Sequence, residues 1–155
     1  MTKLLLSLHV IVAIVAVGPV TVAASIFPRT AREAAAAPGD PAPRAALATL
    51  HRICRVYALL ALLVPALGLA TAGAMGVLGD TWLTASIFLT GAAGFVLAAF
   101  VLPLQERIMR ALDAPPAPAV AATAARLAMT VGIFNLLWAT VTVLMIVRPG
   151  STTGA

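Results

Sequence analysis

His9 is the residue whose type and position point most directly to chemistry. It lies inside an apolar run, and about five residues at 1.5 Å each place it roughly 7–8 Å along a helix. A polar side chain at that depth is expected to face a bundle interior or a wet cavity. Small or apolar residues share its helical face: Val12, Ala13, Ala16 and Val20. Two interpretations follow, a histidine hydrogen-bonded to a neighbouring helix or to water, and an axial ligand of a flat cofactor.

The second histidine and the single cysteine lie together, at the start of another apolar run. His51 is predicted about 30 Å from His9 across the membrane, so both cannot bind one metal ion or one haem. We expect His51 to join Arg52 and Arg55 in a basic patch facing anionic lipid headgroups. Cys54 cannot form an intramolecular disulfide, and we interpret it as a small apolar residue. We predict no metal site and no catalytic residue.

Four long apolar runs must position these side chains. None contains Asp, Glu, Lys or Arg, and each is close to the ~20 residues that cross a bilayer core as a helix. The runs are 4–27, 56–78, 82–104 and 127–147. Apolar residues make up 62% of the 155-residue chain, far above soluble averages. The sequence therefore predicts an all-α, multi-pass membrane protein. Its single domain is a four-helix transmembrane bundle with helical extensions into loops 28–55 and 105–126.

Basic residues are concentrated in those same loops. They are Arg29, Arg32, Arg44, Arg52, Arg55, Arg107, Arg110 and Arg126. On the opposite side of the predicted spans, the only basic residues in the sequence are Lys3 and Arg148. By the positive-inside rule, both loops are expected in the cytoplasm and both termini outside. This distribution explains the net charge of +5 without a nucleic-acid partner.

The first run has a competing interpretation, as a cleaved signal peptide. Lys3 precedes the apolar core, and Val22-Ala23-Ala24 resembles a small-residue cleavage site. Cleavage would place the arginines of loop 28–55 outside, against the charge rule. We therefore expect the first helix to be retained.

Prolines interrupt the first two runs. Pro19 and Pro65 each remove one helical hydrogen bond, freeing the carbonyls of Val15 and Ala61, and are expected to kink their helices. Such kinks can shape a ligand pocket, but they are also common in membrane helices without that role.

Small residues at helical spacing predict close contacts between helices. Small residues spaced four apart let two helix backbones approach closely. A polar residue near the bilayer midplane needs a hydrogen-bond partner across the bundle, and such a bond is worth about 1 kcal/mol. The residues assigned to helix packing are Gly68, Ala72, Gly76, Gly94, Gly132 and Asn135. Their stripes could also dock a second copy of the chain or another membrane protein.

Short motifs in the first two runs resemble a known family. They are Leu8-His9-Val10, Val17-Gly18 and His51-Arg52-Ile53-Cys54-Arg55, with Leu59, Pro65 and Gly68 after them. These motifs are similar to an uncharacterised family of bacterial integral membrane proteins. That family resembles a superfamily of small helical bundles, which includes copper-resistance-protein-D-like proteins and the HemJ-type protoporphyrinogen oxidase.

The resemblance has an implication for His9. In the HemJ-type branch a first-helix histidine is associated with b-type haem, so the resemblance implies haem b at His9. This chain departs from that branch because its runs lack a lysine and a second well-placed histidine. The resemblance therefore supports catalysis less than it supports haem binding. The composition, rich in Ala and Arg, also resembles that of high-GC, actinobacterial proteins, so the resemblance implies the plasma membrane of a bacterium.

Two functions remain open at this point. The first, which we favour, is a non-enzymatic accessory or structural bundle in the lipid bilayer, assembled with itself or with a membrane-complex partner. The alternative is a b-type haem-binding redox or porphyrin-handling protein with His9 as axial ligand. An ion-coupled transporter is supported least, because such carriers keep ionisable groups inside the membrane and His9 is the only one here.

Overall fold

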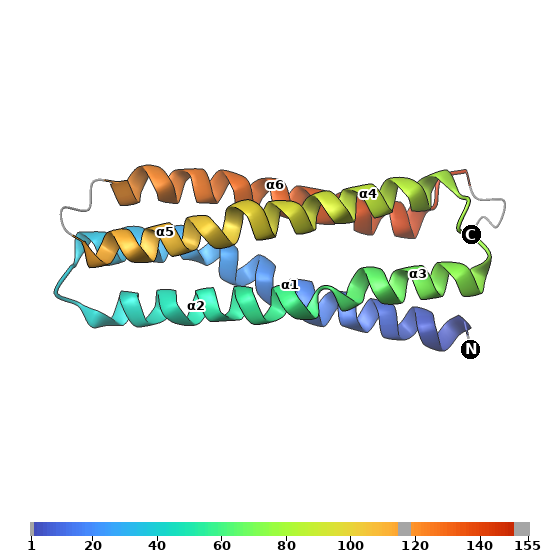
Figure 1. Cartoon of the computed structure of the whole chain (residues 1–155), viewed down its shortest axis with the longest axis horizontal. Coiled ribbons are helices and arrows are strands. Elements are labelled where there is room, and N and C mark those ends of the chain that lie inside the picture. The colour runs from blue at the N-terminus through green and yellow to red at the C-terminus, as the bar shows by residue number, and fades with distance from the viewer. Residues whose placement is uncertain (1, 115–118, 151–155) are drawn as a thin grey trace.

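The computed structural model describes residues 2–114 and 119–150. The elements follow in the order α1 (Thr2–Ala36), α2 (Pro41–Leu60), α3 (Leu63–Met75), α4 (Thr81–Val96), the π-helix η1 (Leu97–Val101), α5 (Leu102–Asp113) and α6 (Ala119–Val147). No strand occurs in the described part of the chain. The helices lie side by side along one long axis (Figure 1), which confirms the predicted all-α bundle.

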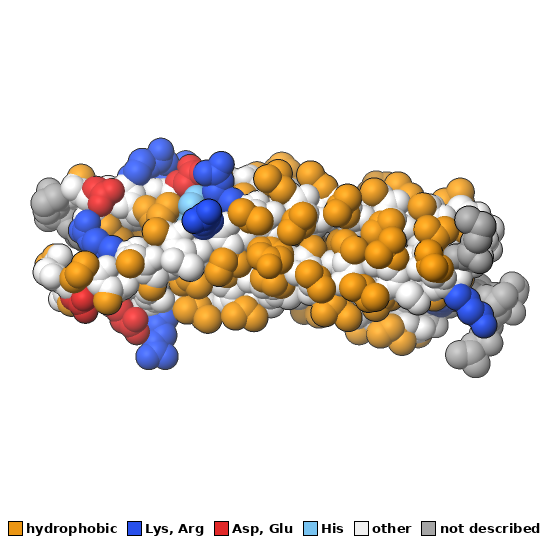
Figure 2. All heavy atoms as spheres, turned by 90° about the horizontal axis from the view of Figure 1, so that it is seen from below, with side chains coloured by type: hydrophobic (Ala, Val, Ile, Leu, Met, Phe, Trp, Pro, Cys, Tyr) orange, Lys and Arg blue, Asp and Glu red, His pale blue; other side chains and the backbone are white. Residues whose placement is uncertain are grey.

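Four helical segments are long and apolar enough to cross a membrane. They are Thr2–Ala36, Pro41–Met75, Thr81–Asp113 and Val120–Val147. The predicted runs lie within them, except that helix stops at Met75 and not at residue 78. Charged side chains gather at one end of the molecule, beyond a belt of exposed apolar side chains (Figure 2). By the length and composition of these helices the chain is a multi-pass membrane protein.

The first long turn is short. α1 ends at Ala36, and α2 begins at Pro41, inside the Pro-rich segment 38–43. Proline is well tolerated in the first helical turn, where its missing N–H would be unpaired anyway. The Asp40 carboxylate caps this end by accepting a hydrogen bond from the Ala42 N–H at 2.9 Å.

The two prolines behave differently. Helix is interrupted at Ala61 and Leu62, between α2 and α3, because Pro65 has no N–H to bond the Ala61 carbonyl. The Val64 N–H bonds that carbonyl instead, at 3.1 Å. By contrast, α1 continues without a break through Pro19 and Pro28. The helix is thus uninterrupted at Pro19, and the kink expected there stays a prediction.

A π-helical turn joins α4 to α5. The Leu102 N–H bonds the Leu97 carbonyl, five residues earlier, just before Pro103. A wider turn of this kind carries one extra residue and so rotates the helix that follows. After it, α5 buries Gln105, Ile108 and Leu112.

The core runs along α1, which contacts α2, α3 and α6. Its largest fully buried apolar side chains come from four helices: Phe27, Leu47, Ile108 and Leu127. A smaller cluster of Ala72, Trp82 and Leu83 lies near the α3–α4 turn. Large apolar side chains cover the outside of the bundle, as expected for helices surrounded by lipid.

Candidate functional site

His9 lies at the contact between α1 and α3. Its side chain is buried, with 6% of the residue exposed, and its Nδ1 is 3.1 Å from the carbonyl oxygen of Val64. A carbonyl oxygen can only accept, so Nδ1 carries the proton and donates it. The histidine thus ties the first helix to the segment just after the Pro65 bend. This geometry is that of a histidine bonded to a neighbouring helix.

Gly68 makes this contact sterically feasible. A Cβ atom built on Gly68 would lie 3.1 Å from His9 Cε1 and 3.5 Å from His9 Nδ1. The first of these separations is tighter than most real Cβ contacts, and the second is an ordinary van der Waals contact, so the imidazole lies directly against the α3 backbone. The structure therefore brings together two residues that the sequence singled out for separate reasons.

The call of His9 as an axial haem ligand stays a prediction. Such a ligand must direct a ring nitrogen toward a space that holds a flat macrocycle, and a hydrogen bond from Nδ1 to a backbone carbonyl is compatible with ligation through Nε2. Here Nδ1 is engaged with Val64, and Nε2 lies 3.8 Å from the position that a Cβ on Gly68 would take. The described residues contain no group of three His, Cys, Asp or Glu side chains that could hold a metal ion.

A second buried polar cluster, which sequence reasoning missed, joins α2 to α5. His51 Nδ1 lies 2.9 Å from Gln105 Oε1, and Gln105 Nε2 donates to Cys54 Sγ at 3.4 Å. Gln105 and Cys54 are fully buried. On the other side of the ring, His51 Nε2 lies 3.8 Å from a Glu106 carboxylate oxygen. We call these four residues the His51–Gln105 cluster.

The position of His51 differs from the sequence-based expectation. We expected its ring to face lipid headgroups together with Arg52 and Arg55, and both arginines are indeed exposed. His51 itself is 8% exposed and is turned toward α5. The reason is its place on the helix: it shares the buried face of α2 with Leu47 and Cys54, at spacings of four and three residues.

The predicted packing residues of the second span divide into different roles. Ala72 is buried in the small cluster with Trp82 and Leu83. Gly76 ends α3 with φ 71°, a left-handed conformation that glycine adopts without strain. No described atom lies within 4 Å of a Cβ built on Gly76, so within this chain Gly76 is a helix cap, and its packing against another helix stays a prediction.

Gly94 and Gly132 are exposed on α4 and α6, and no described atom lies within 4 Å of a Cβ on either. Their predicted contact with another chain stays a prediction. Asn135 donates a hydrogen bond from Nδ2 to Ser25 Oγ at 3.2 Å, across α6 and α1. Its buried Oδ1 has no hydrogen-bond partner among the described residues.

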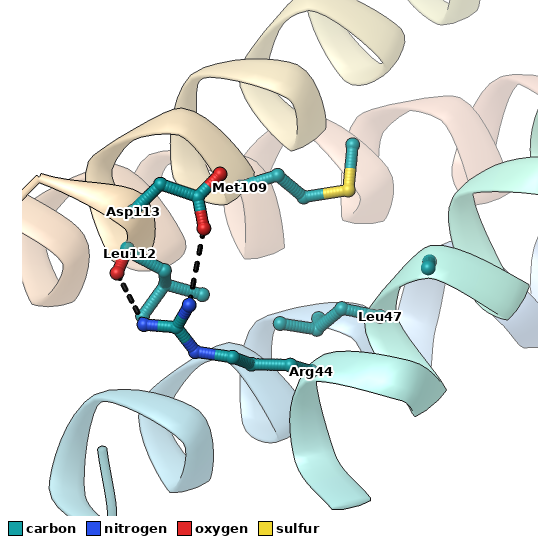
Figure 3. Close-up of a pocket in the computed structure, with 6 residues that line it drawn as sticks. Arg44, Leu47, Met109, Leu112 and Asp113 are labelled. Carbon is teal, nitrogen blue, oxygen red and sulfur yellow. Dashed lines mark hydrogen bonds and ion pairs between the residues drawn. The ribbon is translucent and has the colours of Figure 1, made fainter. Parts of the chain in front are cut away.

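Arg44 of α2 reaches across to the end of α5 (Figure 3). Its guanidinium donates to Asp113 Oδ1 at 3.0 Å and to the Leu112 carbonyl. Leu112 and Asp113 are the last residues of α5, whose carbonyls have no partner inside the helix. A cation at this position also interacts favourably with the helix dipole. The shallow pocket beside it, lined partly by Leu47 and Met109, is thus crossed by a structural ion pair.

Searches for related proteins gave no match: no family model, no curated protein and no solved structure is similar to this chain.

Proposed function

We propose that this chain is a non-enzymatic membrane protein, a structural or accessory helical bundle. The observation that carries the proposal is the use of its polar side chains. His9 binds the α3 backbone, Gln105 binds His51 and Cys54, and Arg44 binds the end of α5. A catalytic acid, base or nucleophile needs a free atom directed at a substrate. Here each of these side chains has at least one polar atom engaged in a contact between helices.

We further propose that the bundle resides in the plasma membrane of a bacterium, with loops 28–55 and 105–126 in the cytoplasm and both termini outside. Support comes from the arginines gathered at one end of the bundle (Figure 2) and from the positive-inside rule. Retention of the first helix is supported by packing. Val20, Ala24 and Phe27 are fully buried, so cleavage near Val22-Ala23-Ala24 would remove part of the core.

We propose a second copy or another membrane protein as the partner of this bundle. The support is the exposed glycines of α4 and α6, because small residues on a lipid-facing surface allow close approach of another helix. Membership in the uncharacterised bacterial family is also a proposal, and it rests on the short motifs around His9 and His51.

One experiment separates this function from the haem alternative. The protein is purified in mild detergent from haem-supplemented cells, and a reduced-minus-oxidised visible spectrum is recorded for the wild type and for His9→Ala. We expect no b-type spectrum in either, together with a lower melting temperature for His9→Ala. Near-stoichiometric haem that disappears in His9→Ala would overturn the proposal and establish His9 as an axial ligand.

The accessory role is tested by assembly. The variants Gly94→Leu and Gly132→Leu are compared with Gly18→Leu, whose glycine is also exposed, on α1, with no described atom within 4 Å of a Cβ. We expect the first two to reduce the assembled mass measured by light scattering in detergent, and Gly18→Leu to leave it unchanged. A monomeric wild type that captures no membrane partner would contradict this proposal.

A further inference from the structure

One surface of the molecule is built from an outward face of α2 alone. Its residues recur at helical spacing and form a shallow groove of about 260 Å³, lined by Ala48, His51, Arg52, Arg55, Val56 and Leu59. Figure 2 shows basic side chains around a histidine, at the border between the charged end and the apolar belt. The groove therefore crosses the level at which a bilayer changes from headgroups to hydrocarbon.

We propose that this groove binds one anionic phospholipid, with its phosphate on Arg52 and Arg55 and an acyl chain along Val56 and Leu59. The proposal does not depend on the accessory role argued above. It assigns a ligand class to a surface whose two arginines form no ion pair among the described residues.

The charges around the groove leave Arg52 and Arg55 available. Neither forms an ion pair within residues 2–114 and 119–150. A carboxylate from a packed helix, that of Glu106 on α5, lies 3.8 Å from His51 Nε2. Since Glu106 faces the histidine, the two guanidinium groups keep an unbalanced positive charge. Guanidinium groups bind phosphate oxygens with paired hydrogen bonds.

The order of side chains along α2 matches the order of groups in a phospholipid. From Arg52 to Leu59 the helix advances roughly 10 Å, at 1.5 Å per residue. Over that distance the groove changes from two arginines to Val56 and Leu59, which are 48% and 70% exposed. A free phosphate would satisfy the arginines but would leave the apolar half of the groove uncovered. A lipid of the anionic cytoplasmic leaflet satisfies both halves.

The inward rotation of His51 fixes one wall of the groove. Its Nδ1 is bonded to the fully buried Gln105, so the imidazole cannot swing outward to fill the space beside Arg55. The His51–Gln105 cluster therefore acts here as a support for the lipid site, and the lipid contacts are assigned to the arginines.

The test compares two double variants of equal charge. Arg52→Gln/Arg55→Gln removes the arginines that line the groove. Arg107→Gln/Arg126→Gln is the matched control, because these two arginines are also exposed and unpaired among the described residues but do not line the groove. Both pairs are exposed, so both variants are expected to fold, with wild-type melting temperatures in phosphatidylcholine.

Binding is measured by native mass spectrometry of the detergent-solubilised protein titrated with phosphatidylglycerol or phosphatidylcholine. We expect one phosphatidylglycerol per chain, preferred over phosphatidylcholine and not displaced by excess inorganic phosphate. Each arginine near an anionic lipid contributes roughly a fivefold gain in affinity, so the groove variant should bind roughly 30-fold more weakly. The Arg107→Gln/Arg126→Gln control should lose far less affinity for phosphatidylglycerol.

Three results would overturn the proposal. Equal losses in both double variants would indicate a general charge effect without a site. Binding of phosphatidylcholine as tightly as phosphatidylglycerol would show that the anionic headgroup is not recognised. Displacement by inorganic phosphate would identify the groove as a site for free phosphate and not for lipid.

Discussion

His9 and Gly68 lie against each other so closely that a single added carbon on Gly68 would come within 3.1 Å of His9 Cε1. The same histidine donates to the Val64 carbonyl, 3.1 Å from its Nδ1, so hydrogen bond and ring contact both hold α1 to α3. Each feature requires the other, because the ring reaches Val64 only where the neighbouring helix lacks a side chain. This pair therefore determines how closely the first and second spans approach.

Enlarging Gly68 should destabilise the bundle. In Gly68→Ala the new methyl group must push the imidazole away by a few tenths of an ångström, and in Gly68→Leu the helices must separate. Overpacking of this kind costs typically about 1–3 kcal/mol. The matched control is Gly91→Ala on α4, where no described atom lies within 4 Å of a Cβ. We expect thermal unfolding in detergent to occur at lower temperature for Gly68→Ala and to be unchanged for the control.

His9→Ala should relieve the clash that Gly68→Ala creates. Alone, His9→Ala loses an interhelical hydrogen bond, worth on average about 0.6 kcal/mol in a membrane protein, and leaves space at the contact. In the double variant the new methyl group occupies part of that space. The double variant should therefore be more stable than the sum of the single losses predicts, measured by unfolding in mixed detergent micelles. Simple additivity would contradict the direct contact between the two residues.

Local sequence patterns were sufficient to predict the spans and one bend. Uninterrupted apolar runs predicted the four membrane-spanning helices, and Pro65 predicted the break at Ala61 and Leu62, because both effects arise within one helix. At Pro19, by contrast, α1 remains continuous, and this helix packs against α2, α3, α5 and α6. The kink expected at Pro19 stays a prediction.

Local sequence patterns do not predict the contact between helices that forms the His51–Gln105 cluster. The spacing of Gln105, Ile108 and Leu112 marks one buried face of α5, and that of Leu47, His51 and Cys54 marks one of α2. Helical periodicity could therefore have predicted that His51 and Gln105 face inward. That the two faces meet depends on the π-helical turn before α5, which rotates the helix and leaves no clear signal in the sequence.

Gln105 should be more important for stability than its neutral side chain suggests. Gln105→Leu keeps a similar volume but removes the partner of both His51 Nδ1 and Cys54. Leaving a buried donor unpaired costs about 1–3 kcal/mol. The control is Thr49→Ala, whose exposed hydroxyl bonds the Ala45 carbonyl within the same helix. We expect a marked drop in melting temperature for Gln105→Leu only, and partial recovery when His51→Leu is added.

Cys54 should react slowly with thiol reagents in the folded protein. It is fully buried and accepts a hydrogen bond from Gln105, and reaction requires both access and the thiolate form. Maleimide labelling, followed by intact mass, should be slow in mild detergent and fast after denaturation in SDS. Gln105→Ala should accelerate labelling of the native state, because it opens space beside the sulfur. Rapid labelling of the wild type would show that α2 and α5 separate readily at this level.

The proposed orientation of the bundle leads to a prediction about accessibility from the two sides of the membrane. In a Cys54→Ser background, which keeps a hydrogen-bond acceptor for Gln105, single cysteines replace Gly39 in the α1–α2 turn or Gly79 in the α3–α4 turn. No described atom lies within 4 Å of a Cβ at either position, so both substitutions fit without strain. Because the arginines favour the cytoplasm, a membrane-impermeant maleimide should label Gly79→Cys in intact cells and Gly39→Cys only after lysis. The reverse pattern would place Arg52 and Arg55 in the outer leaflet, and the proposed lipid would then have to come from that leaflet.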